Sequence, residues 1–171
     1  MLFRSDFTKF WDAKNKLLRS ATGELTWDYG RELITITTPR TQGIIGRATG
    51  RSIELPGVTA TVSTPFVSLL FTPLDDLPLV ESKRILITAL AQDKQTGARY
   101  SADGKMLESV GTAPLLLEPV QASLKFAGAK PTNVTPCDHY GIPMKQTVPI
   151  GSDGSFTING THRAYYYEVR R

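Results

Sequence analysis

The chain has 171 residues, of which 40% are hydrophobic and 21% charged, and this composition suits one folded domain rather than a disordered chain. The net charge of +4 is scattered in pairs such as Lys83-Arg84, so it lacks the clustered basic face typical of nucleic-acid-binding proteins. A single cysteine, Cys137, excludes an intrachain disulfide, which fits a reducing compartment or a secreted domain stable without bridges.

Residues 1–21 differ in their hydrophobic pattern from the remainder of the chain. Their apolar and aromatic side chains fall near helical spacing, and Asp6 is placed to cap such a helix. We therefore expect a short helix or an irregular segment that packs on the domain as an N-terminal extension. The residues concerned are Phe7, Phe10, Trp11, Lys14, Leu17 and Leu18.

From Thr22 onward the pattern indicates β-structure. Leu25 and Trp27 alternate with polar neighbours, and apolar and β-branched runs then recur about every ten residues between turn residues such as Gly, Pro and Asp. The expected strands are Arg31–Thr38, Gly43–Ala48, Ser52–Leu55, Val58–Val62, Phe66–Thr72, Arg84–Ala91, Leu115–Val120, Ala122–Phe126, Val134–Cys137, Gln146–Pro149, Ser155–Ile158 and Tyr165–Val169.

This spacing predicts an all-β fold, an antiparallel β-sandwich of the jelly-roll or immunoglobulin-like type, over residues 22–171. No second helical pattern appears, which argues against a parallel α/β fold. The segment Gln92–Thr112 is the longest irregular connection, and long connections in compact domains are often functional.

Catalytic and metal-binding patterns are weak. Cys137, Asp138 and His139 are adjacent, but neighbours on a strand point to opposite faces, so a hairpin turn explains them better than a triad. Asp75-Asp76 lies between prolines and indicates a turn rather than a calcium site, which needs six to eight oxygens. We expect no cofactor, with a structural calcium ion left open.

Aromatic residues near turns are the remaining chemical signal. Trp11, Trp27, Tyr29, Tyr100 and Tyr140 have flat faces that stack on sugar rings, while polar side chains bond to sugar hydroxyls. The alternation of Trp27 with Leu25 favours a core role for this tryptophan, and sugar binding is the alternative. Of Tyr165-Tyr166-Tyr167, at least one is expected at the surface or at an interface.

An ordered series of motifs resembles a β-rich module at the C-terminal side of bacterial multidomain glycoside hydrolases. The series begins with TGELTWD at 22–28 and ITITTPRTQ at 34–42, and continues through SKRILITA at 82–89 to GTAP at 111–114, LEPV at 117–120 and YYEV at 166–169. The chain departs from that pattern at Arg47, where phenylalanine is frequent, at Gln95, where asparagine is usual, and at Tyr166, where tryptophan is usual.

The resemblance implies an accessory module without catalytic residues, in a secreted and therefore extracellular parent enzyme. Our first hypothesis is binding of a polysaccharide or oligosaccharide, with Trp11, Trp27, Tyr29, Arg40, Gln42 and Tyr100 as candidate ligand-binding residues. The second is a structural module that packs against the catalytic domain or forms a homo-oligomer, which requires a sizeable exposed apolar patch. The third is an enzyme in its own right. No nucleic-acid or membrane partner is expected.

Overall fold

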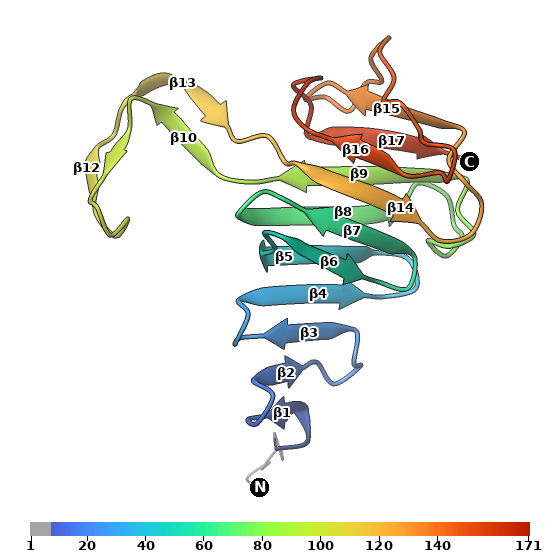
Figure 1. Ribbon diagram of the computed structural model, residues 1–171, viewed down its shortest axis with the longest axis horizontal. Coiled ribbons are helices and arrows are strands. Elements are labelled where there is room, and N and C mark those ends of the chain that lie inside the picture. Colours follow the sequence, from blue (N-terminus) through green and yellow to red (C-terminus); the bar gives the residue numbers. More distant parts are fainter. Residues whose placement is uncertain (1–7) are drawn as a thin grey trace, which may run out of the picture.

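The computed structural model describes residues 8–171, which form an all-β antiparallel sandwich (Figure 1). Its nine-stranded sheet, the large sheet, has the order β1-β2-β3-β4-β5-β8-β9-β17-β15, and its four-stranded sheet, the small sheet, has the order β16-β14-β7-β6. The large sheet contains β1 (Trp11–Asp12), β2 (Leu17–Arg19), β3 (Leu25–Asp28), β4 (Leu33–Thr37), β5 (Gln42–Arg47), β8 (Phe66–Pro73), β9 (Arg84–Leu90), β15 (Asn133–Cys137) and β17 (Tyr166–Arg170). The small sheet contains β6 (Arg51–Glu54), β7 (Val58–Val62), β14 (Ala122–Phe126) and β16 (Phe156–Ile158).

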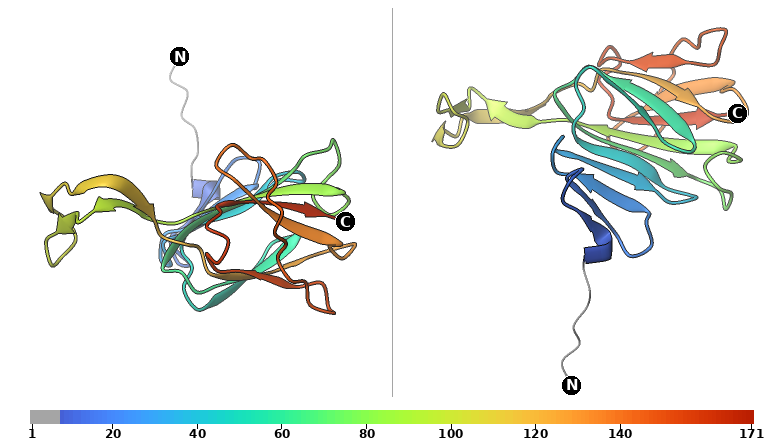
Figure 2. Two further views of the ribbon diagram at one scale, coloured as in Figure 1. Left: turned by 90° about the horizontal axis from the view of Figure 1, so that it is seen from above. Right: turned by 60° about the horizontal axis from the view of Figure 1, so that its bottom comes forward.

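The core lies between the two sheets, which Figure 2 shows edge-on as two layers. Alternate residues of the large sheet point inward, where they meet the inward residues of the small sheet. Phe71 of β8 and Phe126 of β14 touch edge to face across the layers, with ring centroids 5.7 Å apart. The fully buried members include Ile44, Leu69, Phe71, Ile85, Ile87, Leu124, Ile158 and Tyr167.

The first three strands extend the large sheet beyond the reach of the small sheet, and we call β1–β3 the overhang (Figure 1). None of their residues is buried, because no second layer covers either face there. Backbone pairing of β3 with β4 joins the overhang to the sandwich.

Of the two alternatives expected at the N-terminus, a short helix or an irregular segment, the helix is wrong for the described residues. Thr8–Phe10 make one 3-10 turn, η1, and β1 and β2 then form a hairpin. The Asp12 carboxylate accepts hydrogen bonds from the backbone N–H and the side chain of Asn15, so it fixes a turn in place of a helix. Asp6 and Phe7 lie outside the described residues.

An arm projects from the sandwich between β9 and β14 (Figures 1 and 2). It consists of β10 (Asp93–Thr96) paired with β13 (Thr112–Leu117), and β11 (Arg99–Tyr100) paired with β12 (Leu107–Ser109). The segment expected to be irregular, Gln92–Thr112, is therefore largely a β-ribbon.

Most expected strands lie within a few residues of their predicted places, and one prediction is wrong. Gln146–Pro149 forms no strand, although Val148 packs into the core and its N–H donates to the carbonyl oxygen of Val134. Four prolines in this region lack the backbone N–H groups that a regular ladder needs. They are Pro131, Pro136, Pro143 and Pro149.

Candidate functional site

Three aromatic side chains gather on the overhang, and we call Trp11, Trp27 and Tyr29 the aromatic cluster. Trp11 and Trp27 both pair with Leu18 of β2, so the two indoles lie on the same face of the sheet. The indole N–H of Trp11 donates to the Tyr29 hydroxyl at 3.1 Å, and the rings of Trp27 and Tyr29 meet at 66° with centroids 6.0 Å apart. The three predicted ligand-binding residues thus form one surface, in which the rings of Trp27 and Tyr29 are tilted rather than coplanar.

The expectation that Trp27 is a core residue is wrong. Trp27 is 47% exposed and Trp11 is 54% exposed, and Leu25 is exposed beside them. Alternation places Trp27 on the outer face of the large sheet, which no second sheet covers. A period of two assigns residues to faces, but only the sandwich topology decides which face is covered.

The outer face continues across the strands from the aromatic cluster. Pairing runs from Trp27 to Ile34, to Ile45 and to Ser68, and a parallel row runs from Leu25 to Ile36. These isoleucines are only partly buried. The outer face at β3–β5 is therefore apolar and open, in contrast to its far end, where the Glu168 carboxylate lies between Arg84 and Arg170.

An ion pair lies at the end of the same face nearest the arm. The Arg47 guanidinium contacts the Glu32 carboxylate, and both side chains are largely exposed. Gly46 makes this possible, because a Cβ at its positive φ of 129° would overlap the carbonyl oxygen of Glu32. Arg47 also pairs with Phe66 of β8, so this ring, 41% exposed, stands beside the ion pair.

The arm and this end of the sheet enclose a cleft of about 640 Å³, the arm cleft. Tyr100, 43% exposed, borders the arm cleft opposite the sheet, and the Lys94 ammonium lies 5.4 Å from the centre of its ring. The Ser101 hydroxyl donates to the Asp103 carboxylate and keeps its pKa below the ordinary value, so this carboxyl stays charged. The lining consists of Arg47, Phe66, Ala91, Gln92, Asp93, Lys94, Tyr100, Asp103 and Gly104.

Arg40 and Gln42 lie apart from the aromatic cluster. Arg40 donates to the backbone carbonyl of Asp75 at 2.6 Å and pairs with the Asp76 carboxylate, which ties the β4–β5 turn to the β8–β9 loop. Gln42 is 1% exposed, and its Oε1 accepts a 2.7 Å hydrogen bond from the N–H of Gly57, in the turn between β6 and β7 of the small sheet. Gln42 thus has a structural partner and is not accessible to a ligand.

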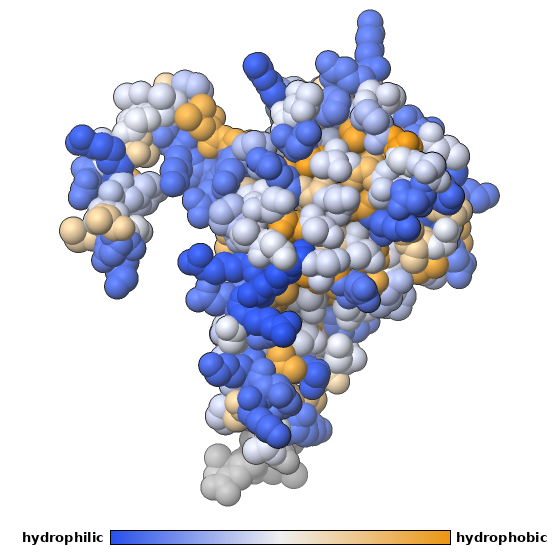
Figure 3. Space-filling view, viewed as in Figure 1, coloured by the Kyte–Doolittle hydropathy of each residue, from blue (hydrophilic) through white to orange (hydrophobic). Residues whose placement is uncertain are grey.

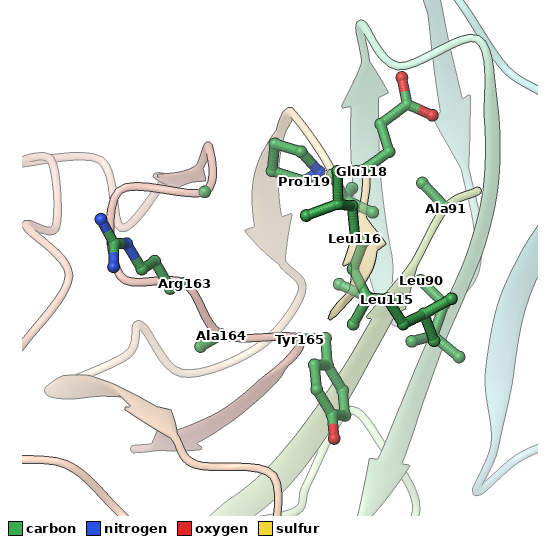
Figure 4. Close-up of a pocket in the computed structure, with 13 residues that line it drawn as sticks. Leu90, Ala91, Leu115, Leu116, Glu118, Pro119, Arg163, Ala164 and Tyr165 are labelled. Atoms are coloured by element: carbon green, nitrogen blue, oxygen red, sulfur yellow. The ribbon is translucent and has the colours of Figure 1, made fainter. Parts of the chain in front are cut away.

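A second pocket of about 420 Å³ lies at the root of the arm (Figure 4). Leu115 and Leu116 of β13 face Leu90 of β9, with Tyr165 and Ala164 from the segment before β17 on the other side. Figure 3 also shows hydrophobic surface where the arm leaves the sandwich. This pocket offers mainly apolar contact.

The polar groups that suggested catalysis have structural roles. Cys137 is buried, and burial raises the pKa of its thiol, which lowers its reactivity. The Asp138 carboxylate accepts hydrogen bonds from the N–H groups of Tyr140 and Ile142, which confirms the predicted turn. The Asp75 carboxylate likewise accepts from the N–H of Lys83. Within residues 8–171, no group of three or more His, Cys, Asp or Glu side chains is placed to hold a metal ion.

Sequence reasoning missed Arg47, Phe66 and Lys94, the residues that connect the aromatic cluster to the arm. Nothing in their local pattern marks them as neighbours, because their proximity depends on strand register and on the bend of the arm.

In the described part of the chain, no helix is long and apolar enough to cross a membrane.

Comparison with protein-family models, with curated proteins and with solved structures finds no match for this chain.

Proposed function

We propose that this chain is a non-catalytic, carbohydrate-binding module of a polysaccharide-degrading glycoside hydrolase, and that the aromatic cluster binds the glycan. One observation carries the proposal: Trp11 and Trp27 stand about half exposed on an overhang that contains no buried residue. Sugar rings present apolar C–H faces and a polar rim, and exposed indole and phenol rings complement both.

The chemistry of the acidic residues supports a binding role over a catalytic one. Glycoside hydrolysis needs two carboxyl groups facing each other across the scissile bond. Glu168 is held by Arg84 and Arg170, and Asp75 and Asp138 accept hydrogen bonds from turn N–H groups. The motif resemblance from Thr22 onward supports a parent enzyme that is secreted and carries its catalytic domain elsewhere.

Affinity electrophoresis of the purified chain against a panel of plant and algal polysaccharides tests the proposal. We expect retardation by at least one polysaccharide, and its loss in Trp27→Ala and Trp11→Ala. Tyr140→Ala is the matched control, because Tyr140 is 79% exposed on a turn outside the aromatic cluster. If no polysaccharide retards the wild-type chain, or if the control loses binding equally, the proposal is wrong.

A second candidate function is docking to another copy of the chain. It is favoured by the aliphatic part of the outer face, where Leu25 is exposed and Ile34, Ile36 and Ile45 are partly buried. Exposed apolar patches of a few hundred Å² on a soluble domain often mark interfaces. The self-complementary packing of two open sheets requires no additional component.

Sedimentation velocity separates the two functions. A concentration-dependent dimer that Ile36→Asp abolishes, together with no retardation by any polysaccharide, supports docking. A monomer over the whole concentration range, together with retardation, supports carbohydrate binding.

A further inference from the structure

The aromatic cluster and the arm cleft lie at one end of the same sheet face. Strands β3, β4, β5 and β8 are neighbours in that order, so Tyr29, after β3, and Phe66, at the start of β8, are separated by three interstrand steps. At about 4.8 Å per step the separation is roughly 14 Å. Figure 1 shows that the turn after β3, the end of β5 and the start of β8 all lie on the side from which the arm projects.

Polar and aromatic side chains fill the interval. Glu32 and Arg47 lie between the aromatic cluster and Phe66, and their carboxylate and guanidinium groups are exposed. Tyr100 and Lys94 of the arm lie across the cleft from Phe66. Along this line, aromatic faces at both ends flank hydrogen-bonding groups in the middle, which is the arrangement that an extended sugar chain requires.

The charges along the line nearly cancel and leave a small anionic excess. Arg47 is paired with Glu32, and the arm contributes Lys94 together with Asp93 and the ionised Asp103. A row of sulfate or carboxylate groups would meet three anionic side chains and only two cationic ones, and would gain little. The chemistry therefore favours an uncharged glycan.

Resting on the carbohydrate-binding function above, we propose that one uncharged polysaccharide chain lies across the strands, from the aromatic cluster to the arm cleft, and that Tyr100 and Phe66 bind the end of the chain beyond Arg47. The aromatic cluster and the arm cleft act together, because a polysaccharide held by the aromatic cluster presents its next sugars to the arm cleft at high effective concentration. The arm is then a part of the glycan-binding site rather than a separate element.

Isothermal titration calorimetry tests this inference. The ligands are oligosaccharides of increasing length, cut from the polysaccharide that retards the protein most in affinity electrophoresis. We expect wild-type affinity to rise with length and then level off. Tyr100→Ala and Phe66→Ala should lower the affinity for the long oligosaccharides about three- to tenfold and leave the affinity for the shortest ligand unchanged. Trp27→Ala should weaken binding at every length.

Two variants on opposite walls of the cleft keep the test independent of any local effect on the arm, and Tyr140→Ala is again the control. Unchanged affinity of both Tyr100→Ala and Phe66→Ala for long oligosaccharides, with binding lost in Trp27→Ala, overturns the inference and leaves the proposed function intact. Absence of wild-type binding to any glycan overturns the proposed function itself. A preference for charged over uncharged oligosaccharides of equal length, with affinity that falls steeply as salt is raised, contradicts the inference of an uncharged ligand.

Discussion

The two faces of the large sheet are made by the same strands, but one face is buried and the other is largely open to solvent. On the inner face Ile44, Leu69 and Phe71 are fully buried against the small sheet. On the outer face Ile34 and Ile45 are only partly buried, and Trp27 is about half exposed. Core packing explains the apolar residues on the inner face but not those on the outer face, and for that reason the outer face is where a ligand or partner is expected.

The largest difference between the faces should appear in stability. Phe71→Ala removes a buried ring that touches Phe126 across the sandwich, so we expect the free energy of unfolding to fall by about 3–5 kcal/mol. Urea denaturation measures the loss. A fall below about 1 kcal/mol would show that the two sheets are less tightly packed than this contact implies.

A smaller loss is expected for the buried polar group on the inner face. Gln42→Leu replaces the amide with an apolar side chain of similar size and leaves the Gly57 N–H without its acceptor, so stability should fall by about 1–3 kcal/mol. Glycan binding should stay unchanged, because Gln42 is buried away from the outer face. A variant that is fully stable yet fails to bind would place Gln42 in the ligand site and contradict this assignment.

Trp27→Ala on the outer face should change stability little and abolish glycan binding. Because Trp27 makes no core contact, the free energy of unfolding should fall by only about 1 kcal/mol, whereas retardation by polysaccharide should be lost. Thermal melting and affinity electrophoresis on the same preparation give both values. A loss of stability as large as that of Phe71→Ala would remove the distinction between the faces.

The smallest effect is expected on the outer surface of the small sheet, which is polar. Hydrogen bonds from Ser155 and Lys125 lower the pKa of Asp153 below its ordinary value of 3.8. A carboxyl with a lowered pKa in the folded state stabilises the fold above pH 4, and this contribution is lost as the pH falls toward the lowered pKa. Asp153→Asn should therefore be slightly less stable than wild type at pH 6, and the difference should shrink below pH 4.

Melting temperatures of the two proteins between pH 2 and pH 6 measure this difference. A difference that stays constant down to pH 2 would show that the charge of Asp153 does not contribute. Lys125→Met, which removes one of the three donor groups, is the companion variant.

The sequence by itself determined the fold class and most strand positions, because a period of two and turn residues act locally. Val58–Val62 and Ala122–Phe126 are strands with the predicted bounds. It also selected Trp11, Trp27 and Tyr29, which the structure brings together. The N-terminal helix was wrong, because the spacing of Trp11, Leu17 and Leu18 fits a hairpin as well, and pairing of β2 with β3 decided between the two.

Which face is covered depended on tertiary structure alone. Alternation separates Trp27 from Thr26, but it contains no information on which face the small sheet covers. The small sheet packs on the face that carries Gln42 and leaves the face that carries Trp27 in solvent. The arm cleft likewise depends on the tertiary structure. Arg47, Phe66 and Tyr100 are far apart in sequence, and only the register of β5 with β8 and the path of the arm bring them together.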